Sequence, residues 1–209
     1  MEEFKNKMIE LENSSSDLTY IASVGSTPVM LTAPHTMEQE LNDHVKHGEF
    51  FTKAIVLYVA EHTLCSYLIK NKDTGIDSNH SDKDLFKTML LNKINENNIK
   101  LVIDIHGAKK ERDFDIELGT LNNLSSDYST IKELIDAFNE KGIFKIEMNN
   151  PFKGGMITQK VYDKTDCDII QIEINSNYRN IDDIEKLKLV CDSLISFIRQ
   201  YVNIIGCDL

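Results

Sequence analysis

Apolar residues along the chain follow two periodicities, and stretches of the two kinds alternate. Short apolar runs at residues 18–23 and 28–33 flank the turn signal Val24-Gly25-Ser26-Thr27, a pattern typical of a β-hairpin. From His47 to about His62 apolar residues recur at intervals of three and four, which predicts a helix that faces the core. The first third of the chain therefore combines strands with a helix.

The remaining sequence continues this alternation. The run Leu101–Gly107 has the apolar, β-branched character of a buried central strand, and it places Asp104 and His106 on one face near its C-terminal end. Such an alternation predicts one domain over residues 1–209, a three-layer α/β/α fold with a mixed, largely parallel central sheet. The other expected elements are strands at 65–69, 144–148 and 169–174, a helix N-capped by Ser81 or Asp82 that ends near Asn97, a Pro/Gly-rich loop at 149–155, and helices at 128–141 and 181–202.

Composition excludes several classes of function. A chain of 209 residues can bury one sizeable core without disulfide or metal support. It has 34 acidic and 23 basic side chains, and a net charge of −11 opposes binding to nucleic acid or to anionic membranes. The sequence has no signal-peptide pattern, no apolar stretch of about 18 residues and no C-x-x-C pair, which predicts a reduced, cytoplasmic protein. It carries no signal for an oligomeric state.

Polar residues that can bind a metal occur at three places where an apolar strand ends. Burial of an unpaired ionisable group costs several kcal/mol, so three such strand ends indicate one convergent site. His35 and Glu38 form an H-x-x-E pair, and together with His106 they match the ligand set of hydrolytic zinc sites. Glu173 remains as a carboxylate suited to general acid/base catalysis. The three strings are Pro34-His35-Thr36-Met37-Glu38, Asp104-Ile105-His106-Gly107 and Gln171-Ile172-Glu173-Ile174-Asn175.

Each of these elements has a simpler interpretation when taken alone. An H-x-x-E spacing arises often by chance, and a D-x-H string also suits a hydrogen-bonded strand end. Glu173 also suits an ion pair with Arg179. A second pair, His44 and His47, lies at a loop-to-helix junction without an obvious third ligand, which favours solvated or substrate-gating histidines. Only the combined order and context of the three strand ends favour a metal site.

The order H-x-x-E, D-x-N, D-x-H and a strand-borne Glu resembles the zinc carboxypeptidase-like superfamily, which includes aspartoacylase and succinylglutamate desuccinylase. The D-x-N element is Asp77-Ser78-Asn79. Within that group the sequence looks most like the N-formylglutamate amidohydrolase family, from about Leu31 to Arg179. The strings that carry this resemblance are Ala33-Pro34-His35, Asp104-Ile105-His106-Gly107, Asn150-Pro151-Phe152-Lys153-Gly154-Gly155, and Gln171-Ile172-Glu173-Ile174-Asn175 with Tyr178-Arg179.

The resemblance implies a phosphorylase/hydrolase-like α/β/α fold and zinc-dependent cleavage of an N-acyl amide, with N-formylglutamate giving formate and glutamate. One Zn²⁺ would be bound by His35, Glu38 and His106. Glu173 would be the general acid/base, and Arg179 would hold a substrate carboxylate or amide group; in the mechanism that we expect, Arg179 also stabilises the oxyanion. Asp104 would orient His106 from the second coordination shell. Candidates for substrate binding are Asn79, His80, Lys153, Gly154 and Asn175.

Two features depart from the family pattern. An arginine commonly follows D-x-N, but in this sequence His80 occupies that position. Either His80, Arg179 or Lys153 takes the place of the missing guanidinium, or the substrate differs from N-formylglutamate. Some relatives place the acidic ligand farther from the first histidine, which makes Glu40 a reserve for Glu38. We expect a metal-dependent amidohydrolase that acts on a small N-acyl amino acid or peptide-like substrate. The alternatives are a zinc peptidase or γ-glutamyl hydrolase on the same site, and a non-catalytic relative that binds metal or ligand.

Overall fold

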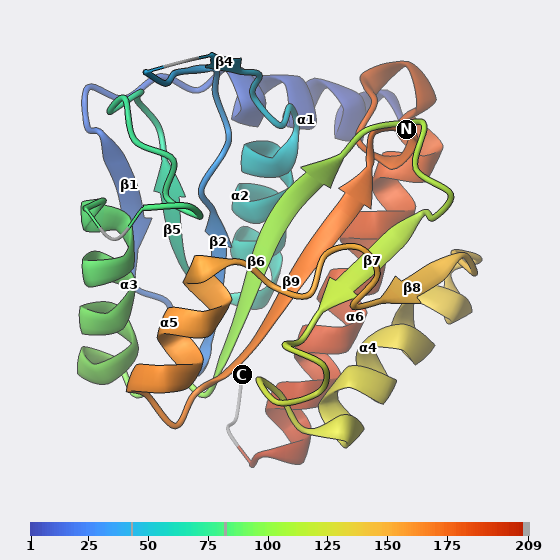
Figure 1. Ribbon diagram of the computed structural model, residues 1–209. Coiled ribbons are helices and arrows are strands. Elements are labelled where there is room, and N and C mark those ends of the chain that lie inside the picture. Colours follow the sequence, from blue (N-terminus) through green and yellow to red (C-terminus); the bar gives the residue numbers. More distant parts are fainter. Residues whose placement is uncertain (43, 82, 207–209) are drawn as a thin grey trace.

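The computed structural model, which describes residues 1–42, 44–81 and 83–206, has a seven-stranded sheet between two layers of helices (Figure 1). The strand order is β1-β5-β2-β6-β9-β7-β8. The four strands β5, β2, β6 and β9 are parallel, whereas β1 and β7 are antiparallel to their inner neighbours. The predicted α/β class with a mixed sheet is confirmed. The strands are β1 (Tyr20–Ser23), β2 (Val29–Ala33), β5 (Ser66–Lys70), β6 (Leu101–Ala108), β7 (Ile116–Gly119), β8 (Ile146–Met148) and β9 (Asp168–Asn175), and a separate ribbon contains β3 (Gln39–Glu40) and β4 (Val45–Lys46).

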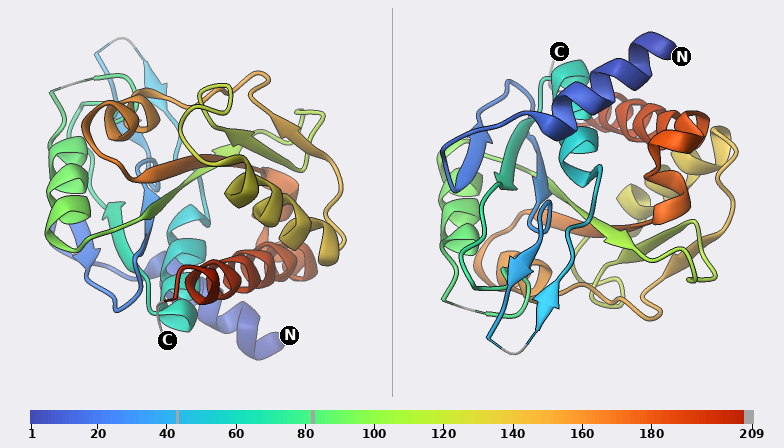
Figure 2. Two further views of the ribbon diagram at one scale, coloured as in Figure 1. Left: turned by 90° about the horizontal axis from the view of Figure 1, so that it is seen from below. Right: turned by 90° about the horizontal axis from the view of Figure 1, so that it is seen from above.

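Helices cover both faces of the sheet, as the views along its edge show (Figure 2). The larger core lies under α1 (Glu2–Asn13), α2 (Thr52–Thr63), α4 (Tyr128–Glu140) and α6 (Ile184–Ile204). The smaller core lies under α3 (Leu85–Glu96) and α5 (Met156–Lys164). Short 3₁₀ turns at Ser176–Tyr178 and Ile181–Asp183 connect β9 to α6.

The face of the sheet under α3 and α5 changes from apolar to polar along each central strand. On β6, Val102 packs in the smaller core, and Asp104 and His106 follow on the same face because side chains alternate along a strand. On β9, Ile169 packs in that core and Glu173 lies farther along the same face. The register pairs His106 with Glu173. The carboxyl edge of the parallel strands, where open α/β sheets place ligands, is therefore the polar edge.

The expected β-hairpin at residues 18–33 is wrong. β1 pairs antiparallel with β5, and β2 lies between β5 and β6, parallel to both. The turn that joins β1 and β2 passes close to the end of α2, where the carbonyl of Leu64 accepts hydrogen bonds from Ser26 and Thr27. Every residue of β2 is buried, as expected for a central strand, and its two neighbours in the sheet are β5 and β6.

Two helix starts differ from the expected positions. α2 begins at Thr52, because Phe51 adopts a left-handed conformation (φ 65°) and the preceding residues form a loop. α3 is capped by Asp84, whose side chain accepts the Phe86 N–H, and not by Ser81. Asp82 lies outside the described residues. The sequence pattern did not predict α1, β7 or α5, and a single domain over 1–209 stays a prediction.

No helix in the described ranges combines the length and the hydropathy needed to cross a bilayer.

Candidate active site

Two histidines and a glutamate meet at the polar edge of the sheet. His35 follows β2, His106 lies on β6, and Glu49 lies in the loop before α2. Their ligand-capable atoms all lie within 4.8 Å of one another. Glu49 Oε1 is 3.0 Å from His35 Nδ1, and Oε2 is 3.5 Å from His106 Nδ1. Glu49 Oε2 also accepts the Gly107 N–H at 2.9 Å, which ties the loop to β6.

A second carboxylate holds each histidine from behind. His35 Nε2 is 2.8 Å from Asp77 Oδ1, and His106 Nε2 is 2.9 Å from Asp104 Oδ2. Asp104 is fully buried and also accepts the Thr32 hydroxyl at 2.5 Å. Both rings thus direct Nε2 to an aspartate and Nδ1 to Glu49. Such carboxylate–histidine pairs fix the ring orientation and the tautomer of metal-binding histidines.

Charges in the cluster stabilise one another. Burial opposes the charged form of Glu49, but His35 and His106 outweigh it and hold the pKa of Glu49 well below its usual value. Burial likewise opposes protonation of His106, yet Asp104 and Glu49 raise its pKa well above the usual value. Buried carboxylates that face imidazoles in this way favour a positive charge between them.

The donor set fits a divalent metal ion. Two imidazole Nδ1 atoms and one carboxylate, backed by further carboxylates, are the ligands of hydrolytic zinc sites that keep one coordination position open. The cluster also attracts a cation of the chain itself: Lys46 Nζ lies 2.9 Å from Asp77 Oδ2 and within 3.1 Å of both ring nitrogens of His35. His35, Glu49 and His106 would hold the ion, with Asp77 and Asp104 behind the two rings.

Two further glutamates continue the row of side chains from His106 across the sheet. Glu173 on β9 is the cross-strand neighbour of His106, and burial raises its pKa to about 7. The side-chain amide of Gln171 donates to Glu173 Oε1 at 3.0 Å. On the other side of Glu173 stands Glu117 of β7, which is fully buried and accepts the Phe152 N–H. No described residue pairs with the second oxygen of Glu117.

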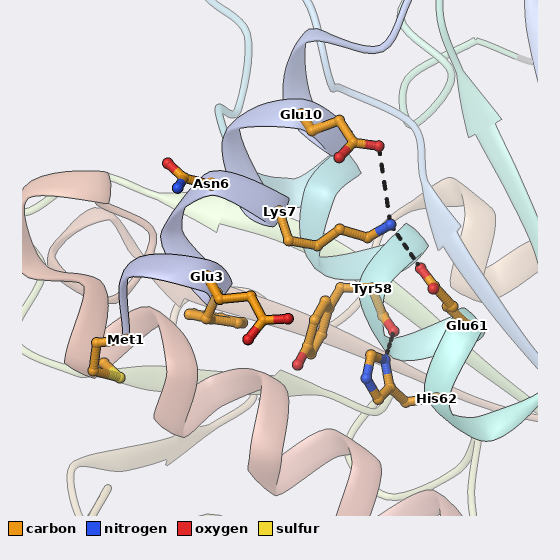
Figure 3. Close-up of a pocket in the computed structure, with 9 residues that line it drawn as sticks. Met1, Glu3, Asn6, Lys7, Glu10, Tyr58, Glu61 and His62 are labelled. Atoms are coloured by element: carbon orange, nitrogen blue, oxygen red, sulfur yellow. Dashed lines mark hydrogen bonds and ion pairs between the residues drawn. The ribbon is translucent and has the colours of Figure 1, made fainter.

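A cavity of about 560 Å³ opens onto this cluster. His35, Glu49, His106 and Glu173 line its floor, and residues 151–155 form part of its wall. A larger cavity, of about 960 Å³, lies elsewhere, between α1 and α2 (Figure 3). There Lys7 of α1 pairs with Glu10 and Glu61. The candidate site is therefore the smaller cavity, where the buried ionisable groups converge.

The structure does not bring the expected acidic ligand to the cluster. The Glu38 side chain is 62% exposed and lies 3.2 Å from the exposed ring of His47. Glu40, the reserve, is also exposed. After His35 the β3–β4 ribbon leads the chain outward and back, and the Glu49 N–H then donates to the His35 carbonyl at 2.8 Å. This bond places Glu49 at the position expected for Glu38.

Arg179 and Asn175 hold backbone and do not line the cavity. The Arg179 guanidinium is buried and donates to the carbonyls of Ile174 at 2.8 Å, Ala108 at 3.1 Å, and Phe50. Asn175 donates to the carbonyls of residues 112 and 114 at 3.2 and 2.9 Å. The roles expected for these two residues, oxyanion stabilisation and substrate binding, do not fit this geometry.

The other four substrate-binding candidates do line the cavity: Asn79, His80, Lys153 and Gly154. Asn79 Oδ1 accepts the Ile157 N–H at 3.1 Å and so fixes the start of α5. The ring of His80 is 78% exposed, 3.1 Å from Asp77, and Lys153 is exposed. Gly154 has a φ of 101°, which a side chain would strain, and this conformation lets the loop pass over β7.

Sequence reasoning missed four residues of the site. Glu117 carries the signal that identified Glu173, an ionisable residue in an apolar run, here Ile116-Glu117-Leu118-Gly119. Arg112 is exposed on the cavity wall, with its guanidinium 5.0 Å above the centre of the Phe152 ring. Glu49 and Lys46 carry no sequence signal, because loop geometry alone brings them to the cluster.

One known protein family matches part of this sequence. Residues 86–178 match the family model of N-formylglutamate amidohydrolase, which confirms the resemblance expected from the sequence. This match includes His106 and Glu173 but begins after His35 and Glu49. A search of curated protein sequences found no match.

Several solved structures share the fold at low sequence identity. The N-formylglutamate amidohydrolase of Ralstonia eutropha superposes with a TM-score of 0.65 at 14% identity, covering 88% of this chain and 98% of that one. A bacteriophage poly-γ-glutamate hydrolase gives 0.58 at 17% identity, covering 91% and 93%. A metallo-carboxypeptidase of Pseudomonas aeruginosa gives 0.55 at 11% identity, covering 96% and 68%.

Proposed function

We propose that the protein is a metal-dependent amidohydrolase that cleaves the amide bond of a small N-acyl amino acid or a peptide-like substrate. The observation that carries the proposal is the convergence of His35, Glu49 and His106 beside a buried Glu173. The match to the N-formylglutamate amidohydrolase family supports amide hydrolysis as the reaction class. We propose zinc as the metal, since two imidazoles and one carboxylate suit it.

The ligands in this proposal are His35, Glu49 and His106, with Glu49 in place of Glu38. The chemistry that such an ion supplies when bound is Lewis-acid activation of water and of the amide carbonyl. Asp77 and Asp104 hold the Nε2 atoms of the two histidines, so that both rings direct Nδ1 toward Glu49, where the ion would be held. Lys46 would then remain paired with Asp77 at the rim.

Glu173 moves the proton in this mechanism. Its carboxylate accepts a proton from the attacking water and returns it to the leaving nitrogen, a role worth about 10²–10⁴-fold in rate. Gln171 holds Oε1 of Glu173, and burial excludes bulk water from the carboxylate. Arg179 is fully engaged with backbone carbonyls, so the oxyanion needs another donor in the cavity. Exposed cationic side chains of the cavity wall, Arg112 and Lys153, are available for the substrate carboxylate.

Metal removal and restoration test the proposal. The purified chain is analysed for bound metal, dialysed against a chelator, and assayed with N-formylglutamate, N-acetylglutamate and a glutamyl dipeptide before and after zinc is returned. We expect one equivalent of metal, loss of hydrolysis in the chelated protein and recovery with zinc. A chain that hydrolyses these amides equally well without metal would contradict the mechanism.

The same assay separates the two rival functions. Preference for the dipeptide over both N-acyl amino acids would identify a peptidase on the same site. Binding of a substrate to the zinc-loaded chain, detected as a rise in melting temperature without turnover, would identify a non-catalytic relative.

A further inference from the structure

A second cavity adjoins the candidate active site. It has a volume of about 600 Å³, and we call it the outer cavity; it is lined by residues 45–50, 107–111, Ser176 and Arg179. The two cavities share five lining residues, namely Lys46, Glu49, Gly107, Ala108 and Lys109. They therefore meet along the ridge that Glu49 and the end of β6 form.

Basic residues outnumber acidic residues in the lining of both cavities, although the protein as a whole is acidic. The whole chain has 34 acidic and 23 basic side chains, but each cavity has four Lys or Arg residues against two Glu. In the site cavity the cationic residues are Lys46, Lys109, Arg112 and Lys153, and in the outer cavity they are Lys46, Lys109, Lys110 and Arg179.

Four of these cations are available to a ligand. Lys109, Lys110, Arg112 and Lys153 are exposed, and no ion pair within residues 1–42, 44–81 and 83–206 uses them. Their charges are thus not neutralised by carboxylates in salt-bridge contact. A groove whose walls carry one sign of charge concentrates ligands of the opposite sign. Arg112 and Lys153 line the site cavity, Lys110 lines the outer cavity, and Lys109 lines both.

We propose that the two cavities form one cleft that binds an acidic oligomer of amide-linked units, with the cleaved bond in the site cavity and a further acidic unit in the outer cavity. This inference rests on the proposed function and deepens it. A single cavity of 560 Å³ already lies in the range that holds a drug-sized ligand, about 300–1,000 Å³. The outer cavity adds room that one N-acyl amino acid does not use.

The walls of the outer cavity suit such a unit in two ways. Lys109 and Lys110 would contact its carboxylate. Val45 and Phe50 are 50% and 64% exposed, and they offer an apolar surface to the methylene groups of a glutamate side chain. Acidic side chains with aliphatic stems therefore match both the charge and the apolar surface of the outer cavity.

Binding to a catalytically impaired chain tests the inference. Full-length Glu173→Gln protein, loaded with zinc, is titrated by calorimetry with N-formylglutamate, α-linked tetraglutamate and γ-linked tetraglutamate. We expect at least one tetraglutamate to bind about tenfold or more tightly than N-formylglutamate, and we expect added salt to reduce this gain because exposed charges are screened. The two linkages identify whether a peptide or a γ-linked polymer is the better ligand.

A charge reversal in the outer cavity tests whether the tighter binding of tetraglutamate depends on that cavity. Lys110→Glu in the same background should abolish the tighter binding of tetraglutamate and leave N-formylglutamate binding within threefold. Lys132→Glu is the matched control, since Lys132 is 61% exposed on α4, and it should preserve the gain. Equal affinity for monomer and oligomers, or equal losses in the two lysine variants, would overturn the inference.

Turnover by the wild-type chain separates this inference from the proposed function. If tetraglutamate binds as expected but no amide is hydrolysed, the proposed function fails and the cleft stands. If N-formylglutamate is hydrolysed and binding shows no dependence on length, the cleft fails and the proposed function stands.

Discussion

The candidate site has two halves that are held in different ways. His106, Asp104 and Glu173 lie on adjacent strands, where ladder hydrogen bonds fix their relative positions. His35 and Glu49 lie in the segment between β2 and α2, and individual contacts hold them. The Glu49 N–H donates to the His35 carbonyl, and Arg179 donates to the Phe50 carbonyl.

The family match covers the strand-borne half, with His106, Asp104 and Glu173, and not the loop-borne half, with His35 and Glu49. Strands thus carry residues that sequence order can predict, whereas loops carry residues whose position depends on tertiary contacts.

The largest expected effect is on the strand-borne half. Glu173→Gln removes the proton acceptor but keeps the shape of the side chain, so kcat/KM should fall by about 10²–10⁴-fold. Metal content should stay at the wild-type value because Glu173 is not one of the proposed ligands. The matched control is Glu147→Gln on β8, an exposed glutamate two strands away, which should retain full activity. Retained activity in Glu173→Gln would exclude it as the general base.

The loop-borne half is tested by comparing Glu49 and Glu38, the two candidates for the acidic metal ligand. Glu49→Gln weakens one ligand of the proposed site, so zinc affinity should fall by about 100-fold or more, beyond the usual effect of removing a residue behind a ligand. Glu38→Gln should leave zinc affinity within threefold, since the exposed Glu38 side chain pairs with His47 and lies outside the cluster of His35, Glu49 and His106. Competition with a chromogenic chelator measures both values. The opposite ranking would return Glu38 to the site.

The strand-borne half could be predicted because its signals are local. Leu101–Gly107 is an apolar run that is interrupted by an aspartate and a histidine, and the alternation of side chains along a strand places both on one face. The same reasoning applies to Glu173. Glu117 carries the same signal, but residues 116–119 form too short an apolar run to indicate a strand from the sequence alone.

The loop-borne half could not be predicted for physical reasons. Thirteen positions separate His35 from Glu49, and nothing in their sequence specifies that the β3–β4 ribbon folds outward. The spacing of H-x-x-E therefore favoured Glu38, the nearer acid. The expected hairpin of residues 18–33 failed for the same reason, because the turn at residues 24–27 is held by the distant Leu64 carbonyl and β1 pairs with β5 instead.

An intermediate effect is expected from the aspartate behind His106. Asp104→Asn keeps a hydrogen-bond acceptor but removes the charge that orients the ring, so zinc affinity should fall by about 10–100-fold. The Thr32 hydroxyl still has an acceptor in this variant, which limits the loss of stability. Asp113→Asn is the control, because Asp113 is exposed, pairs with Lys145 and is not among the residues that line the site cavity. Equal zinc affinity in Asp104→Asn and the wild type would remove Asp104 from its proposed role.

The smallest effect on catalysis is expected where the two halves are joined. Arg179 binds the Phe50 carbonyl of the loop-borne half and the carbonyls of Ala108 and Ile174 at the strand ends. Arg179→Met leaves these carbonyls without that donor, which should lower the free energy of unfolding by about 1–3 kcal/mol in urea titrations. Arg199→Met, which removes one exposed bond to the His62 carbonyl, should cost less. If Arg179 only joins the two halves, the zinc-loaded Arg179→Met variant should keep kcat within about tenfold of wild type. A fall in kcat as large as that of Glu173→Gln, with unchanged stability, would instead assign Arg179 to the reaction itself.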